Sequence, residues 1–169
     1  MNLLTLVVLG IISIAACCKF GDLKNWGEYY STILFYNVGA MTENIITRNR
    51  PLWLFYGSHM TDTIADYVFG FLIFPFIIIL YLSRYPKARK KRILYTTAFI
   101  SFMSLVELIL YKIQELQYYN GWNVGWSILL YVGVFPLLRL HSKRPLTAML
   151  ILFTLTVGGL LCFHIAIID

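Results

Sequence analysis

Apolar runs of membrane-crossing length recur along almost the whole chain and leave little room for any other kind of fold. A helix needs about 20 predominantly apolar residues to cross the hydrocarbon core of a bilayer. Six segments approach that length and are expected to be transmembrane helices: 2–18, 26–46, 63–82, 93–111, 122–140 and 146–168. The sequence therefore predicts an all-α, polytopic transmembrane helix bundle that forms one domain over residues 1–169.

The second of these segments is less apolar than the others. It contains Asn37 and Glu43, and an aromatic cluster of Trp26, Tyr29 and Tyr30 lies at its start. A segment of this kind either spans the bilayer or lies partly in the interface, so the prediction is six spans, or five if segment 26–46 is re-entrant or interfacial. With 59% hydrophobic and only 13% charged residues, the chain has no stretch that could form a soluble domain of useful size.

Basic residues are concentrated in alternate loops, and the loop after the third segment is the richest. Its members are expected to set topology and to meet lipid headgroups: Arg84, Lys87, Arg89, Lys90, Lys91 and Arg92. Arg139 and His141 lie at the same predicted interface, where lipid contact is the ordinary interpretation. The positive-inside rule places loops 83–92 and 139–145 in the cytoplasm. The net charge of +6 is therefore attributed to contacts with the lipid bilayer, which is the predicted partner. No nucleic-acid partner is predicted.

The cysteines indicate neither a disulfide framework nor a metal site. The three cysteines, Cys17, Cys18 and Cys162, have no CxxC spacing and all lie near the ends of apolar segments. Small hydrophobic side chains in helices are the simplest interpretation. No cofactor and no metal is predicted from the sequence.

Glu107 is the most informative ionisable residue, because a carboxylate inside a bilayer is costly and is retained for a reason. It lies about one turn before the end of the fourth segment, with Tyr111 one turn further on the same face. One interpretation is a ligand for a proton or cation that faces the bundle interior. The other is a structural carboxylate, paired with Lys112 or hydrogen-bonded to a tyrosine, that holds two helices together.

His59, Asp62 and Asp66 form a second group of candidates, with a spacing that puts them on one face of a helix. An imidazole and two carboxylates could bind a divalent metal. The simpler interpretation is that acids in a first helical turn complement the helix dipole. Glu43 is predicted near the same membrane face and could join this group.

Two local signals predict the shape of the chain between spans. Pro75 lies in the middle of the third segment and should kink it, because proline lacks the N–H of a helical hydrogen bond. Asn120-Gly121 is a turn signal between the fourth and fifth segments. A tight loop there predicts that these two segments form an antiparallel hairpin.

No catalytic motif accompanies these features: GxSxG, HExxH, HxxEH and a P-loop are all missing from the sequence. The first hypothesis is therefore a structural or accessory membrane component, acting through helix contacts with a membrane-protein partner or lipid. The second is a small ion or solute transporter or channel, acting as a homo-oligomer with Glu107 on its pathway. The third is an intramembrane enzyme that acts on lipid through His59, Asp62 and Glu107; an enzymatic function is not expected.

Several strings also occur here in an order and spacing found together in one protein family. They are Tyr81-Leu82-Ser83-Arg84-Tyr85-Pro86, Glu107 ahead of Tyr111-Lys112-Ile113, Tyr119-Asn120-Gly121-Trp122, Trp126-Ser127-Ile128-Leu129 and Phe135-Pro136-Leu137-Leu138-Arg139-Leu140-His141, and the likeness extends over roughly residues 26–145, most of the chain. Through them the chain resembles a family of small, uncharacterised multi-pass membrane proteins of Bacillus, Clostridium and related spore-forming Firmicutes.

The resemblance implies a bacterial cytoplasmic membrane protein and implies no particular activity. The residues that match the family pattern are Glu107, Asn120, Trp122, Trp126, Pro136, Arg139 and His141. His59 falls where members of the family tend to carry histidine. Asp66 departs from the glutamate-like or apolar residue found there, which weakens the metal interpretation.

Overall fold

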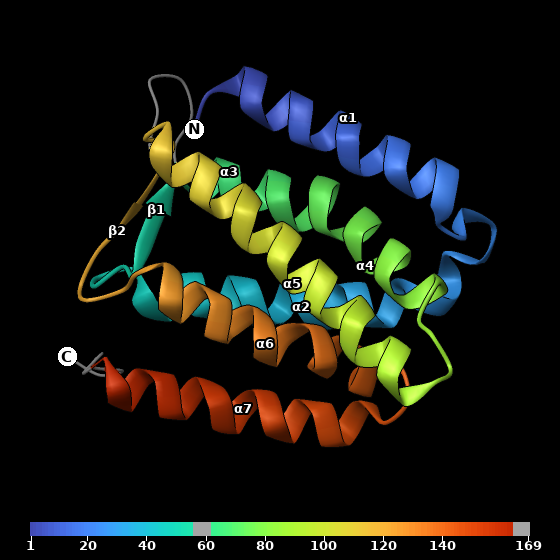
Figure 1. Cartoon of the computed structure of the whole chain (residues 1–169). Coiled ribbons are helices and arrows are strands. Elements are labelled where there is room, and N and C mark those ends of the chain that lie inside the picture. Colours follow the sequence, from blue (N-terminus) through green and yellow to red (C-terminus); the bar gives the residue numbers. More distant parts are fainter. Residues whose placement is uncertain (56–61, 164–169) are drawn as a thin grey trace.

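The computed structural model describes residues 1–55 and 62–163, and it is predominantly helical, at 79%. The helices lie side by side as a bundle (Figure 1). Their bounds are α1 Leu3–Phe20, α2 Gly27–Thr47, α3 Asp62–Val68, α4 Phe74–Ser83, α5 Arg89–Lys112, α6 Val124–His141 and α7 Pro145–Cys162. Two short helical turns, η1 (Leu23–Asn25) and η2 (Phe69–Ile73), connect some of them. The predicted helical class is confirmed.

Five helical stretches are long and apolar enough to cross a membrane within the described residues. They are α1, the continuous stretch Asp62–Ser83 that joins α3, η2 and α4, and then α5, α6 and α7. Helix α2 falls outside this set, as the lower hydropathy of segment 26–46 leads one to expect. It is nevertheless one unbroken helix of 21 residues, and it packs against α4, α6 and η2 within the bundle.

The buried face of α2 explains its low hydropathy. Thr32 and Asn37 are both buried, although α2 also exposes the apolar side chains of Val38 and Ile45. A membrane bundle gains little from burying apolar groups, because lipid is equally apolar, and small or polar residues are common at its helix contacts. The buried residues Thr32 and Asn37 therefore lie where α2 meets neighbouring helices.

Two helices begin at asparagine caps, and one begins before its apolar segment. Asn2 caps α1 through Leu4 N–H, and Asn123 caps α6 through the N–H groups of Gly125 and Trp126. Helix α5 begins at Arg89, inside the basic run and before the expected start at residue 93. The apolar residues therefore indicate where the chain enters the bilayer. They do not indicate where the helix itself begins.

Pro75 disrupts the helix as expected, and the disruption takes the form of a wide turn. In η2 the Phe74 N–H bonds to the carbonyl of Phe69, five residues back, rather than to the usual fourth. Proline removes one helical donor and its ring clashes with the carbonyl four residues earlier, so a widened turn before it relieves both problems. The wide turn includes Phe69 and Gly70.

A short antiparallel strand pair is a feature that the all-α prediction did not include. Strand β1 (Trp53–Phe55) pairs with β2 (Leu116–Tyr118), so that Trp53 lies opposite Tyr118 and Phe55 opposite Leu116. We call the end of the bundle that carries this pair the strand end, and the opposite end, with connections 21–26, 84–88 and 142–144, the basic end (Figure 1). The pairing joins segments about sixty residues apart, which no local pattern could indicate.

Helices α5 and α6 are packed neighbours that run in opposite directions, as predicted, but their connection is longer than the expected tight loop (Figure 1). It includes β2 and then a turn at Asn120-Gly121. Both residues have positive φ, at 50° and 84°, and Trp122 N–H bonds to the carbonyl of Tyr119 at 2.9 Å. Asn120 also donates from its side chain to the carbonyl of Pro51 at 2.7 Å, which ties the turn to the chain before β1.

Gly121→Ala is expected to lower the free energy of unfolding by about 1 kcal/mol, because a Cβ at this positive φ is strained. Titration of the purified protein with a denaturing detergent, followed by far-UV circular dichroism, measures the change. Gly133→Ala is the matched control: it lies in α6 with open space around it, so it should be neutral or slightly stabilising. Equal effects at the two glycines would contradict the assignment of the turn.

Candidate functional site

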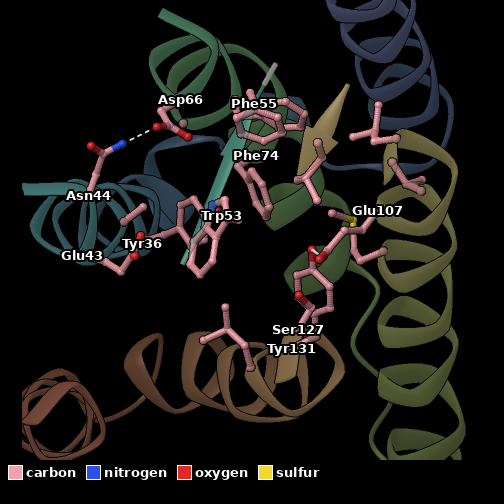
Figure 2. Close-up of a pocket in the computed structure, with 18 of the residues that line it drawn as sticks. Tyr36, Glu43, Asn44, Trp53, Phe55, Asp66, Phe74, Glu107, Ser127 and Tyr131 are labelled. Carbon is pink, nitrogen blue, oxygen red and sulfur yellow. Dashed lines mark hydrogen bonds between the residues drawn. The ribbon is translucent and has the colours of Figure 1, made fainter. Parts of the chain in front are cut away.

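A cavity of about 140 Å³ lies inside the bundle toward its strand end. Residues of α2, α3, η2, α4, α5 and α6 form its walls, together with residues of both strands. Three carboxylates line it, from Glu43, Asp66 and Glu107. Figure 2 shows these acids around a group of aromatic side chains: the aromatic lining residues are Tyr36, Trp53, Phe55, Phe69, Phe74 and Tyr131.

Glu107 lies at the inner wall of this cavity and is 8% exposed. Its two carboxylate oxygens accept hydrogen bonds from two tyrosines, Tyr118 at 2.7 Å and Tyr131 at 2.5 Å. Because Tyr118 belongs to β2 and Tyr131 to α6, this carboxylate joins three elements. Its contacts are those of the hydrogen-bonded structural interpretation, and Lys112 is exposed at the end of α5.

Tyr118 lies outside the membrane-spanning helices. Burial raises the pKa of its phenol, and the hydrogen bond to Glu107 raises this pKa further. Its hydroxyl therefore stays protonated at neutral pH and serves as a donor. Tyr111 stacks on Tyr118 with ring centroids 4.9 Å apart, but it is 44% exposed and does not line the cavity.

Glu43 and Asp66 lie on another wall, where the end of α2 meets α3. Asn44 donates a hydrogen bond to Asp66, and Thr47 donates to Glu43 at 3.1 Å. Both acids are partly exposed, unlike Glu107. The site therefore has a buried carboxylate and two carboxylates nearer the surface.

Asp62 has a different role from its neighbours. Its Oδ1 accepts the backbone N–H of Phe55 at 2.6 Å, which fixes the end of β1 against the start of α3. Asp62 does not line the cavity. His59 lies outside the described residues, so its placement relative to Asp62 and Glu107 is not part of the structure. Among the residues that are described, no group of three His, Cys, Asp or Glu side chains is arranged to hold a metal ion.

Two polar residues of the site escape sequence inspection because they resemble ordinary membrane residues. Tyr131 lies in an apolar helix, one turn after Ser127, and both line the cavity. Ser127 accepts a hydrogen bond from the Trp122 indole at 2.9 Å. The four-residue spacing of a hydroxyl and a phenol on α6 is the available signal, and it is a weak one.

A buried acceptor without a donor lies beside the cavity. The side chain of Asn37 is 4% exposed, and its Oδ1 has no hydrogen-bond partner in the described part of the chain. This oxygen is 3.3 Å from the position that a Cβ would take at Gly70, which lines the cavity. A buried polar atom in this state is destabilising unless a ligand or water satisfies it.

At the basic end, most of the predicted headgroup-binding residues are exposed. Lys87, Arg89, Lys90 and Lys91 lie on the surface. The remaining arginines there make local contacts: Arg84 donates to the carbonyl of Phe20 at 2.7 Å, Arg92 donates to that of Pro86 at 3.0 Å, and Arg139 lies over the ring of Tyr85 at 4.7 Å.

His141 differs from its expected position at the lipid interface. It is 7% exposed, stacks on Phe35 with centroids 4.2 Å apart, and lies 3.0 Å from the Thr32 hydroxyl through Nδ1. The reason is that α6 continues to His141, and its last turn packs on α2. His141 therefore forms a contact between α6 and α2 and is buried rather than exposed at the interface.

No family model, curated protein or solved structure matches this chain. The likeness to the spore-former membrane family thus rests on the sequence strings alone.

Proposed function

We propose that the chain is a small-solute transporter of a bacterial cytoplasmic membrane, and that the cavity is its solute site. The observation that supports this most is the convergence of Glu43, Asp66 and Glu107, from three different helices, on one internal cavity. Intramembrane carboxylates are costly and tend to mark the pathways of ions or substrates. Binding sites between the helices of a bundle are a common location for small molecules.

The proposed topology has six spans, with α2 included. It places the basic end in the cytoplasm, because loops 83–92 and 139–145 carry an excess of Lys and Arg. The cavity then lies in the outer half of the bilayer. Since residues of a single chain line the cavity, solute binding needs no second copy. The proposal also includes a continuous pathway formed by several copies of the chain.

A structural or accessory role is the second candidate, and α7 supports it. This helix packs against α6 and exposes large apolar side chains, including Leu146 at 76% and Phe153 at 70%. Lipid or the helix of a partner protein could cover that face. In this case the hydrogen bonds of Glu107 would serve only to hold α5, α6 and β2 together.

Access to the cavity distinguishes the two functions. In a protein with the native cysteines replaced, Ser127→Cys puts a thiol on the cavity wall with little change in size. If the cavity takes solutes from outside, membrane-impermeant methanethiosulfonates should label this thiol in right-side-out vesicles. The labelling is measured by mass spectrometry of the intact protein.

Two further cysteine variants serve as controls. Asn49→Cys is exposed at the strand end and should react, whereas Ile78→Cys is fully buried away from the cavity and should not. An unreactive Ser127→Cys beside a reactive Asn49→Cys would overturn the transport proposal and leave the accessory role. Labelling of Asn49→Cys only in inside-out vesicles would reverse the proposed orientation.

A further inference from the structure

We propose that the ligand of this cavity is a small alkylammonium cation, an inference that rests on the proposed function above. The size of the cavity, the charge of its lining and the chemistry of its walls each restrict the ligand. Together they select a compact organic cation over an anion, a metal ion or a neutral solute.

The size sets an upper limit on the ligand. The cavity measures about 140 Å³, and an apolar protein cavity of about 150 Å³ is known to accept benzene. A ligand of similar bulk fits, such as tetramethylammonium or choline. A disaccharide or a complete phospholipid is too large for this space.

The charge of the lining restricts the sign of the ligand. Glu43, Asp66 and Glu107 all contribute to the walls, and no lining residue in the described part of the chain is Lys, Arg or His. Carboxylates in an apolar surrounding carry a desolvation penalty that a bound cation offsets. An anion would instead add repulsion to that penalty.

The aromatic walls favour an organic cation over an inorganic one. Two stacked pairs fix these walls, Tyr36 on Phe74 at 4.3 Å and Phe55 on Phe69 at 4.8 Å between centroids. Alkylated ammonium groups bind aromatic rings through their spread positive charge. Calcium and magnesium require several convergent oxygen ligands, whereas Figure 2 shows Glu43 and Glu107 on opposite sides of Trp53.

A second polar feature points to a ligand with a donor group. Within the described residues, Asn37 Oδ1 is buried without a hydrogen-bond partner. Asn37 does not itself line the cavity, but it lies next to the lining residue Gly70. A ligand hydroxyl or N–H could satisfy it, as choline and primary or secondary amines provide. Neither tetramethylammonium nor a metal ion offers such a donor, so choline is expected to bind more tightly than tetramethylammonium.

The test compares choline with 3,3-dimethylbutan-1-ol, which has the same shape and hydroxyl but no charge. Both are titrated into the full-length protein in lipid nanodiscs, and binding is measured calorimetrically. Choline should bind, and the neutral analogue should bind at least about tenfold more weakly, because it lacks both the cation–π and the carboxylate interactions.

Paired variants show whether binding occurs in this cavity. Trp53→Leu and Glu43→Gln alter lining residues and should each weaken choline binding several-fold. Their controls are Trp26→Leu and Glu28→Gln, which make the same changes at exposed positions toward the other end of α2. Glu43→Gln is nearly isosteric, so it keeps the test valid if Trp53→Leu fails to fold.

The outcomes separate this inference from the proposed function. Equal binding of choline and its neutral analogue would overturn the cation inference and leave a solute site. If neither compound binds while Ser127→Cys is still labelled, the cation inference is overturned and the solute site remains. Choline binding that Trp53→Leu and Glu43→Gln leave unchanged would place the ligand elsewhere and overturn the assignment to this cavity. An unlabelled Ser127→Cys is the separate result that removes the proposed function.

Discussion

Replacing Glu107 by leucine is expected to lower the free energy of unfolding by about 1–3 kcal/mol. The change removes the acceptor for two tyrosine hydroxyls, of Tyr118 and Tyr131. Hydrogen bonds between membrane helices contribute about 0.6 kcal/mol on average and up to about 1.7 kcal/mol, which is less than buried bonds in soluble proteins. Two such bonds, and two phenols left without partners, give the expected range.

Glu107→Gln is the matched control, because glutamine has nearly the same shape and can serve both tyrosines. Its carbonyl oxygen accepts from one phenol, and its amide N–H donates to the oxygen of the other. We expect this variant to lose less than about 1 kcal/mol of unfolding free energy. Detergent titration followed by circular dichroism measures both variants, and equal losses would contradict a role of Glu107 as a shared acceptor.

The same pair of variants separates the structural role of Glu107 from a role in binding. Glutamine keeps the hydrogen-bonded shape but has no charge, so Glu107→Gln should weaken choline binding while the protein stays folded. If the carboxylate were only structural, choline affinity would be unchanged in this variant. The two interpretations that the sequence leaves open are therefore not exclusive, and each has its own measurement.

Local patterns were sufficient to predict the helices. Hydropathy over a window of membrane-crossing length locates each of α1, α5, α6 and α7 to within a few residues at most ends, because this signal is an average over many side chains. The turn at Asn120-Gly121 was also predictable, since both residue types tolerate the left-handed conformation found there. Pro75 similarly marked the disrupted helix.

Contacts between distant segments were not predictable from these patterns. The pairing of Trp53 with Tyr118 needs segments 53–55 and 116–118 to meet, and neither segment alternates long enough to indicate a strand. Tyr131 reaches Glu107 from another helix, so nothing near either residue in the sequence reveals the bond. Contacts between distant segments depend on how the helices pack.

The acidic residues of the candidate site could be predicted from the sequence, whereas its aromatic walls could not. Glu43, Asp66 and Glu107 stand out because charge is rare in apolar segments, and the structure brings these three to one cavity. Asp62 is an equally evident charge in the sequence, but its carboxylate accepts a hydrogen bond from the backbone N–H of Phe55. The aromatic walls look like ordinary membrane residues in the sequence, and only packing reveals that they surround one space.

Tyr81→Ala is expected to lower the free energy of unfolding by about 3 kcal/mol, the largest change among these variants. Tyr81 is 0% exposed, and its ring lies within 5.1 Å of Phe99 and 5.0 Å of Phe135, measured between centroids. Removing a large buried aromatic ring costs about 3–5 kcal/mol in soluble proteins through lost transfer energy and an unfilled cavity. In a membrane the transfer contribution is small, since lipid is also apolar, so the lower limit applies.

Tyr81→Phe separates the packing of this ring from its hydroxyl, which lies 3.1 Å from the hydroxyl of Thr96. Phenylalanine keeps the ring packing and loses the hydrogen bonding of the hydroxyl, so the expected cost is about 1 kcal/mol or less. Tyr81 does not line the cavity, and choline affinity should therefore be unchanged in Tyr81→Phe. A cost for phenylalanine as large as that for alanine would mean that the hydroxyl, rather than ring packing, stabilises this part of the bundle.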